Sequence, residues 1–382
     1  MRNYSHSPGA AGSAHSRLCD ILKGSAVPRL PLMDGPTPLE QRDDIGSDLG
    51  IRVFLKREDK ADDLGCGHKL RKLSYLMADA HALGSDVLVT AGSLPSNQCK
   101  AVAAWAPRHN LRAHLVFGGD HQCRPPVAHG NYLLTSLLLA TVTWHERSPW
   151  SSIDRLLGEA AEAERRNGCC PYVIGSGASQ WPGLLGSVEL GFEIAAQLDA
   201  KDVDSCHLVA VAGSGGTCLG LAIAAGVLGR SWAVTGVCVA EGAAQVMQRC
   251  RAMQADFARR TGLAVPIEGI LDFTEAARGN GYDLPTPQEL EAVAMAVRRY
   301  GLLLDPNYMI KAYLGLRSLV TSSLLRADSA VLIHSGGQFG VFDSGGAWER
   351  WHRSTYWPQL ACDNTLPRSQ GMPATRAVDR GF

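Results

Sequence analysis

The strongest constraint on the fold is a repeated order along the chain: a short apolar run, a loop containing glycine or serine, and a helix-forming segment. The clearest example is a predicted buried strand at 207–212, the loop Gly213-Ser214-Gly215-Gly216-Thr217, and a predicted helix at 218–228. Parallel strands need such helical crossovers, so this order predicts an α/β fold built on parallel sheets.

The same order recurs from residue 51 to residue 334. Apolar or alternating runs predict further strands at 51–56, 87–90, 111–117, 140–144, 172–174, 232–240 and 330–334. Helical periodicity predicts helices at 70–83, 99–105, 131–139, 153–166, 186–198, 243–262, 287–300 and 310–325. We therefore expect two α/β domains with parallel or mixed sheets.

Composition excludes several classes of protein. Of 382 residues, 46% are hydrophobic and 19% charged, which supports a large core and argues against global disorder. Lys+Arg and Asp+Glu both number 37, so no net charge favours nucleic acid or an anionic membrane. The 11 cysteines are an odd number without CxxC pairs and, with the histidines, lack metal-ligand spacing, which indicates a reduced chain without a metal site.

Both ends of the sequence are predicted to have little regular structure. Residues 1–20 are polar, lack the apolar region of a secretory signal, and are expected to be a disordered leader. The segment 346–382 is expected to be a polar, irregular tail. No apolar run is long enough to span a membrane, so we expect a cytoplasmic protein without a membrane partner.

Lys69 is the first candidate for chemistry. It lies in Gly67-His68-Lys69-Leu70-Arg71-Lys72, at the start of a predicted helix. The helix N-terminus and the cations Arg71 and Lys72 would lower the pKa of Lys69, as suits a lysine that bonds covalently to a carbonyl group. The alternative is a solvated basic patch.

A second candidate is the loop Gly213-Ser214-Gly215-Gly216-Thr217. Its successive backbone N–H groups, its hydroxyls and the following helix N-terminus would bind a phosphate. The loop lacks the Walker A and GxGxxG patterns. The alternative is a tight turn between strand and helix.

Further polar residues are expected where the strands of the sheet end, near the two candidates above. Ser96, Asn97 and Gln98 lie where a strand gives way to a helix, and they would bind a carboxylate or simply cap the helix. Tyr282 and Tyr308 lie on turns, where loop packing is the alternative, and Ser335 follows the last strand. A lysine, a phosphate site and polar loops together indicate pyridoxal 5'-phosphate as the cofactor.

These residues resemble the D-cysteine desulfhydrase and 1-aminocyclopropane-1-carboxylate deaminase family, pyridoxal-phosphate enzymes with a fold like the tryptophan synthase β subunit. The likeness runs from about Pro28 to Phe342. Its motifs are Pro36-Thr37-Pro38-Leu39, Leu55-Lys56-Arg57-Glu58-Asp59, residues 67–73, Ser96-Asn97-Gln98, residues 213–217, Gly281-Tyr282-Asp283-Leu284-Pro285-Thr286, Leu304-Asp305-Pro306-Asn307-Tyr308 with Lys311, and His334-Ser335-Gly336-Gly337.

The resemblance implies roles for the candidate residues. Lys69 would hold the cofactor and move the substrate's α-proton, and Asn97 would face the ring hydroxyl of the cofactor. Residues 213–217 would bind the phosphate, and Ser335 the pyridine nitrogen. Ser96, Asn97, Gln98, Tyr282 and Tyr308 would contact the substrate, and Ser96 would bind its carboxylate and could relay a proton. The catalytic residues would thus be Lys69, Ser96, Tyr282 and Tyr308.

Three departures from the family pattern affect the expected substrate. His68 stands where the family usually has Asn, and Met309 stands where the deaminases have Glu. Ser335 replaces the Leu of the deaminases and the Thr of the desulfhydrases. A serine accepts or donates a hydrogen bond at the ring nitrogen without protonating it, which suits elimination better than ring opening.

The expected activity is therefore α,β-elimination on D-cysteine or a related amino acid, giving pyruvate, ammonia and sulfide. Ring opening of the cyclopropane substrate and β-replacement stay open as alternatives, as does a silent cofactor-binding module. By resemblance, the large domain comprises 21–69 and 186–345, the small domain comprises 70–185, and the protein is a homodimer.

Overall fold

The computed structural model describes residues 8–22, 27–119, 124–125, 127–343 and 345–356. The chain divides into two compact units, Met1–Ser344 and Gly345–Phe382. Within the described residues, no helix is both long and apolar enough to cross a membrane.

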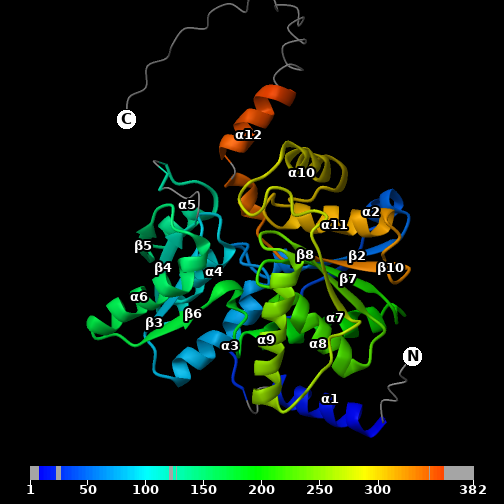
Figure 1. Ribbon diagram of the computed structural model, residues 1–382, viewed down its shortest axis with the longest axis horizontal. Helices are drawn as coiled ribbons and strands as arrows, with labels where there is room; N and C mark the ends of the chain where they lie inside the picture. The colour runs from blue at the N-terminus through cyan, green and yellow to red at the C-terminus, as the bar shows by residue number, and fades with distance from the viewer. Residues whose placement is uncertain (1–7, 23–26, 120–123, 126, 344, 357–382) are drawn as a thin grey trace, which may run out of the picture. The chain divides into compact units, whose positions relative to one another are not determined.

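The first unit contains two sheets, seen as separate groups of strands in Figure 1. The six-stranded sheet has the order β1-β2-β10-β7-β8-β9, and the four-stranded sheet the order β5-β4-β3-β6. All pairings are parallel except that of β1 with β2. The predicted fold class, two α/β sheets of parallel or mixed strands, is confirmed.

The strands are β1 (Leu39–Gln41), β2 (Arg52–Arg57), β3 (Val87–Gly92), β4 (Arg112–Gly118), β5 (Thr141–His145), β6 (Pro171–Ile174), β7 (His207–Ala212), β8 (Ala233–Cys238), β9 (Leu271–Thr274) and β10 (Ser329–His334). The α-helices of the first unit are α1 (Pro8–Leu22), α2 (Asp43–Leu49), α3 (Lys69–Ala82), α4 (Asn97–Trp105), α5 (Gly130–Leu137), α6 (Ile153–Arg166), α7 (Leu184–Asp199), α8 (Gly216–Leu228), α9 (Ala243–Thr261), α10 (Pro287–Tyr300) and α11 (Met309–Thr321).

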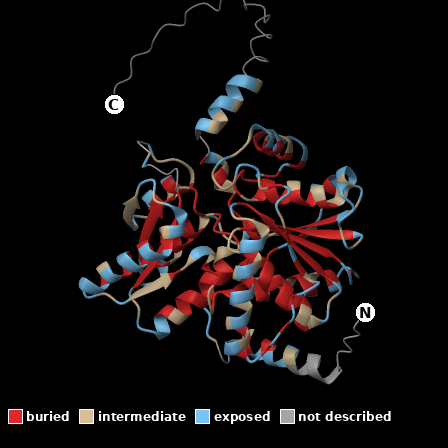
Figure 2. Cartoon of the chain, in the orientation of Figure 1, coloured by how far each residue is buried: buried red, intermediate tan, exposed pale blue. Residues whose placement is uncertain are grey.

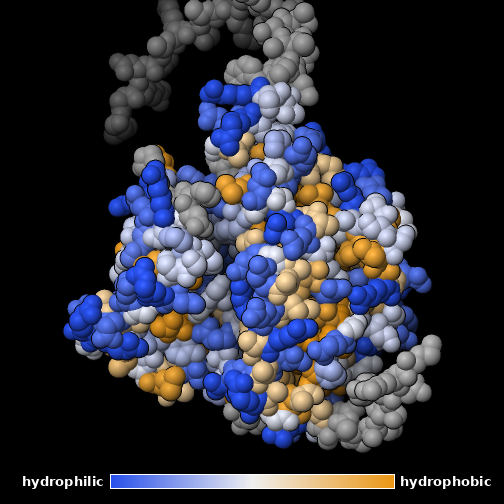
Figure 3. Space-filling view, viewed as in Figure 1, coloured by the Kyte–Doolittle hydropathy of each residue, from blue (hydrophilic) through white to orange (hydrophobic). Residues whose placement is uncertain are grey.

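The apolar pattern of the strands determines how the layers pack. Every residue of β3, β7, β8 and β10 is buried, as expected of parallel strands covered by helices on both faces. Val87 and Val89 of β3 pack on α6, while Leu88 packs on the side of α3 and α4. Helix α6 keeps its charged face in solvent, as the blue residues along it in Figures 2 and 3 show.

The expected disordered leader is wrong for residues 8–20. They belong to α1, in which Leu18 is 0% and Ile21 8% exposed, within the core cluster that also contains residues of α7 and α8. Tertiary packing therefore stabilises a helix in a segment whose polar composition predicted no regular structure. Residues 1–7 lie outside the described residues.

The second unit is helical where it is described. The segment expected to be an irregular tail forms α12 (Gly345–Trp351) and the short helical segment η6 (His352–Tyr356). Trp348 and Trp351 pack edge to face, with ring centroids 5.5 Å apart. The prediction of irregular structure is wrong for 346–356, and residues 357–382 lie outside the described residues.

The sequence also missed α2, β1 and β9. Each is short, at seven, three and four residues. The strands β1 and β9 are the two edges of the six-stranded sheet, and α2 packs on β2. The four-stranded sheet falls within 70–185 and the six-stranded sheet within the two flanks. The domain boundaries themselves stay a prediction.

Candidate active site

One cavity of about 520 Å³ brings the predicted site residues together. It lies where β7, β8 and β10 of one sheet and β3, β4 and β6 of the other end, which is where open parallel sheets bind ligands. All twelve candidates line it: Lys69, Ser96, Asn97, Gln98, Gly213, Ser214, Gly215, Gly216, Thr217, Tyr282, Tyr308 and Ser335.

Lys69 begins α3 and faces this cavity. Its Nζ lies 3.4 Å from the carbonyl oxygen of Gly177. Burial lowers the pKa of Lys69 from 10.5 to about 8. The direction of the shift agrees with the sequence prediction, but its main cause is desolvation rather than the neighbouring cations Arg71 and Lys72.

The start of α3 is anchored by buried ion pairs. Arg71 is 5% exposed and donates to Glu58 at 2.6 Å and to Glu193 at 2.8 Å. Glu193 also pairs with Lys56 of β2. The alternative of a solvated basic patch is therefore wrong, because Arg71 joins α3 to the six-stranded sheet and α7.

Gly67 allows a close approach on the other side of Lys69. It has φ +61°, and a Cβ at this position would lie 2.3 Å from the carbonyl oxygen of Ser335. The same oxygen accepts from the His68 backbone N at 3.1 Å and contacts His68 Nδ1 at 2.8 Å. Because a carbonyl only accepts, Nδ1 carries the proton. Burial, with Lys69 and Lys72 nearby, holds the pKa of His68 well below its usual value, so its ring is neutral.

The loop at 213–217 has the form of a cradle. Gly215 has φ +84°, and a Cβ there would lie 2.6 Å from Cys250 Sγ; one on Gly216 would lie 2.1 Å from Ser179 Oγ. Packing therefore requires glycine at 215 and 216, and with no side chains at 213, 215 and 216 the loop can present its backbone N–H groups to the cavity that it lines. Ser214 Oγ lies 3.0 Å from Ser179 Oγ.

Lys72 was not among the predicted site residues, yet it lines the same cradle. It is 1% exposed, and its Nζ donates to Ser179 Oγ at 2.9 Å and to Gly177 O at 3.1 Å. It supplies a buried amine beside a phosphate-type loop, and burial, with Lys69 nearby, holds the pKa of Lys72 well below its usual value. Lys72 thus contacts the glycine/serine loop at 175–179, which follows β6. The composition of this loop is a sequence feature that could have indicated a second segment beside the cradle.

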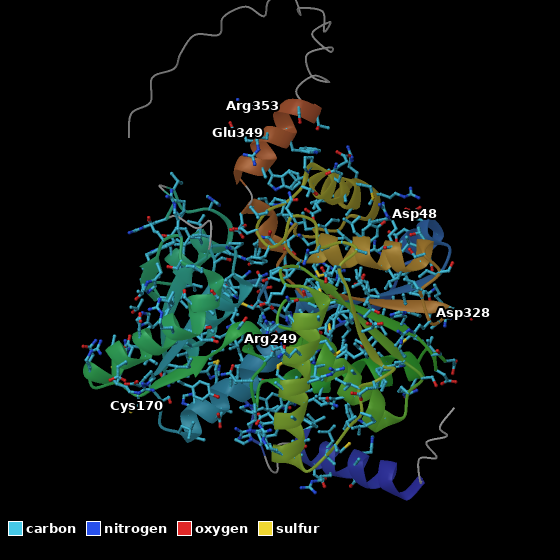
Figure 4. The ribbon with its side chains drawn as sticks, viewed as in Figure 1. Asp48, Cys170, Arg249, Asp328, Glu349 and Arg353 are labelled. Atoms are coloured by element: carbon cyan, nitrogen blue, oxygen red, sulfur yellow. The ribbon has the colours of Figure 1, made fainter. Side chains whose placement is uncertain are left out.

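Arg249 and Glu241 also line the cavity and were missed. Arg249 lies on α9, as Figure 4 marks, and its Nη1 donates to Gly213 O at 3.3 Å. It forms an ion pair with Glu241. Nothing in the sequence separates this arginine from the others on the same amphipathic helix.

Ser96, Asn97 and Gln98 combine capping with cavity lining. Ser96 Oγ accepts from Cys99 N at 3.1 Å, so the capping alternative is also true of this serine. Asn97 Oδ1 accepts from Asn131 Nδ2 at 2.8 Å. Gln98 Nε2 donates to Thr90 Oγ1 at 2.7 Å and Gly175 O at 2.9 Å, so its amide donors are bound within the protein.

The two tyrosines face each other, with ring centroids 5.3 Å apart at 60°. Burial raises the pKa of both phenols, so they are neutral donors at ordinary pH. Tyr308 is held by Asp305, whose Oδ2 accepts from its backbone N at 2.9 Å. Burial raises the pKa of Asp305 to about 7, although three backbone N–H donors lower it.

Ser335 and Met309 contact each other beside the cavity. Met309 Sδ lies 3.3 Å from Ser335 N and 3.4 Å from Ser335 Oγ. Met309 is 0% exposed. A thioether has no proton to give, so no acid stands at this position.

The fold and the cavity define a class of protein: an α/β enzyme with a buried lysine beside a phosphate-type cradle. The sequence matches the family described as "Pyridoxal-phosphate dependent enzyme" over residues 30–336, and the chain belongs to this family. The predictions of an enzyme and of its cofactor are confirmed.

Particular relatives agree with this assignment. The chain is 32% identical over 323 residues to the D-cysteine desulfhydrase of Serratia proteamaculans (strain 568), covering 84% of this chain and 97% of the relative. A solved structure titled as an ACC deaminase homologue is 29% identical with TM-score 0.78, covering 87% of this chain and 98% of that one. Threonine deaminase isoform 2 from Solanum lycopersicum, 16% identical with TM-score 0.58 over 93% of this chain and 91% of its own, shows the fold alone.

The residues present fit pyridoxal phosphate. The cradle at 213–217 lines the cavity with three glycines and the hydroxyl-bearing Ser214 and Thr217, and the buried amine of Lys72 lies beside it. Lys69 lies in the same cavity with a lowered pKa. A phosphate site and a reactive lysine are the two features that this cofactor requires.

Proposed function

We propose that the protein catalyses α,β-elimination on D-cysteine or a related β-substituted amino acid. With one water consumed, the products from cysteine are pyruvate, ammonia and sulfide. The observation that carries the proposal is the shared cavity, in which Lys69, the 213–217 cradle, Ser96 and the two tyrosines all meet.

The residues divide into a cofactor group and a substrate group. Lys69 would hold the cofactor covalently, residues 213–217 with Lys72 its phosphate, Asn97 its ring hydroxyl, and Ser335 its ring nitrogen. When bound, the cofactor draws electrons from the substrate's α-carbon. Ser96 and Gln98 would contact the substrate, and Tyr282 and Tyr308 would flank it.

Lys69 is the proposed proton carrier. A pKa of about 8 gives a substantial fraction of neutral amine near neutral pH, which is the form that accepts the α-proton. The two neutral tyrosine hydroxyls provide donors beside the departing sulfur. Release of the β-substituent with its bonding electrons then completes the elimination.

Ser335 and Met309 favour elimination over ring opening. The alternative, opening of a cyclopropane amino acid, has a poorer leaving group and gains more from a protonated pyridine nitrogen. Neither a serine hydroxyl nor a thioether supplies that proton. β-Replacement with a second nucleophile is the other alternative, and product analysis distinguishes it.

The test is product analysis with the purified enzyme and pyridoxal phosphate. D-cysteine, L-cysteine, D-serine and 1-aminocyclopropane-1-carboxylate are supplied in turn, and keto acid and sulfide are measured. We expect keto acid with sulfide from D-cysteine, and loss of both in Lys69→Ala but not in Lys60→Ala, an exposed lysine. Keto acid from the cyclopropane substrate alone would contradict the proposal, as would conversion of pyruvate release into a new amino acid on addition of a thiol.

A homodimer and a cytoplasmic location belong to the same proposal. Apolar side chains on and beside α5 are exposed, Leu133 by 43%, Leu137 by 68% and Leu139 by 88%, and would suit contact with a second copy. Light scattering of the eluted protein measures the mass: a monomer would contradict the dimer. Cell fractionation tests the location.

A further inference from the structure

Asn131 is a buried side chain with a defined task that the proposed function does not include. It is the second residue of α5, is 0% exposed, and does not line the cavity. Its Nδ2 donates to Pro95 O at 2.9 Å and to Asn97 Oδ1 at 2.8 Å. Both donors of this amide are thus directed at the loop that carries Ser96 and Asn97.

These contacts determine which way the two amides face. Pro95 O is a carbonyl oxygen and only accepts, so the atom of Asn131 that faces it is the nitrogen. That nitrogen also faces Asn97, which must then present its oxygen to Asn131. The Asn97 nitrogen is therefore on the opposite side, where a Cβ on Gly337 would lie 2.5 Å from it.

Asn131 is itself held in place by Asp343. The backbone N of Asn131 donates to Asp343 Oδ1 at 2.8 Å. A Cβ on Gly130 would lie 2.0 Å from the same oxygen, so the glycine permits this contact. The chain of contacts thus runs from Asp343 through the start of α5 to Asn97.

We propose that Asn131 is a positioning residue that keeps the Asn97 amide nitrogen, not its oxygen, available to the ligand. Asn97 then presents hydrogen-bond donors to the ligand, so binding of an anionic oxygen is favoured over binding of a hydroxyl. This rests on the proposed function, in which that oxygen belongs to the cofactor ring. Asn131 acts through Asn97 and touches neither cofactor nor substrate.

The test compares pyridoxal phosphate binding and the absorbance of the bound cofactor in single and double variants. Asn131→Asp keeps the shape but replaces the donor by an acceptor, which favours a reversed Asn97 amide. We expect roughly 10- to 100-fold weaker cofactor binding, the effect of one hydrogen bond to a charged group. We also expect a shifted absorbance maximum and a changed pH dependence of that absorbance. Thr135→Val is the matched control, because Thr135 is also buried on α5 and its hydroxyl donates to the Asn131 backbone oxygen at 2.8 Å.

The Asn97→Ala background decides whether Asn131 acts through Asn97. If it does, Asn131→Asp adds little to the loss already caused by Asn97→Ala. If Asn131→Asp weakens cofactor binding as much in the Asn97→Ala background as in the wild type, or no more than Thr135→Val does, this inference is overturned while the proposed function stands. If circular dichroism shows that Asn131→Asp is unfolded, the same cycle with Asn131→Ala decides. A wild-type protein that binds no pyridoxal phosphate would overturn the proposed function and this inference with it.

Discussion

At the scale of single residues, burial rather than neighbouring charge determines the chemistry of the cavity. Lys69 has a pKa of about 8 because it is desolvated, and His68 is neutral chiefly for the same reason. Of the two residues that the sequence placed beside Lys69, Arg71 pairs with Glu58 and Glu193, whereas Lys72 and Lys69 both donate to the Gly177 oxygen, at 3.1 and 3.4 Å. Proximity in sequence therefore corresponds to proximity in space for Lys72, whereas the charge of Arg71 is matched by two carboxylates.

The pKa of Lys69 predicts how cofactor attachment depends on pH. The neutral amine is the form that bonds to the cofactor's carbonyl, so the attachment rate to the cofactor-free protein should rise with pH. The rise should be roughly tenfold per unit below the pKa and level off above about 8. Stopped-flow absorbance measures this rate. If the rate instead levels off near pH 10.5, the pKa of Lys69 is not lowered from its ordinary value.

At the scale of elements, a single buried lysine connects α11 to the turn that carries Tyr282. Lys311 is 0% exposed, and its Nζ donates to Arg278 O at 2.6 Å and Gly281 O at 2.8 Å. It also pairs with Glu289 at 3.1 Å, which caps α10 together with Thr286. Helices α10 and α11 thereby hold the tyrosine turn against the cavity.

Replacing this lysine should loosen that turn. Lys311→Met removes three contacts and leaves Glu289 as an unpaired buried charge, which costs about 3–5 kcal/mol in comparable cases. We expect a free energy of unfolding lower by that order in urea titration, and faster proteolysis near residue 280. Lys201→Met, at an exposed lysine, is the control and should change little. Equal stability of the two variants would refute the role given to Lys311.

At the scale of the whole first unit, the cavity exists because strands from two sheets end at one place. Residues following β7, β8 and β10 meet residues following β3, β4 and β6. Around this arrangement, the core extends to α1, a helix near the N-terminus that packs with α8. The unit therefore depends on a segment that composition alone assigns to disorder.

The contribution of α1 is measurable. Leu18→Ala should lower the free energy of unfolding by roughly 2–5 kcal/mol, the usual cost of a truncated buried leucine. Ser16→Ala, exposed on the same helix, should change it by less than about 0.5 kcal/mol. Urea denaturation followed by circular dichroism compares them. If both variants match the wild type, α1 contributes nothing to the core.

The sequence by itself determined the order of elements between β2 and β10, apart from the missed strand β9, and the loops that carry the chemistry. Apolar runs and helical periodicity are local properties, and a strand followed by a glycine loop and a helix presents backbone N–H groups whatever surrounds it. Lys69, the 213–217 loop, Ser96 to Gln98, the tyrosines and Ser335 were found in this way, and the resemblance gave them their expected roles.

Only the tertiary structure decided the rest. Lys72, Arg249 and Asn131 reach the site or its supports from segments whose local pattern marks them as ordinary helix. The helix α1 and the short strands β1 and β9 form because neighbours bury or pair them. The physical reason is the same in each case: burial and hydrogen-bond partners come from contacts distant in sequence, and these determine both a marginal element and the pKa or orientation of a side chain.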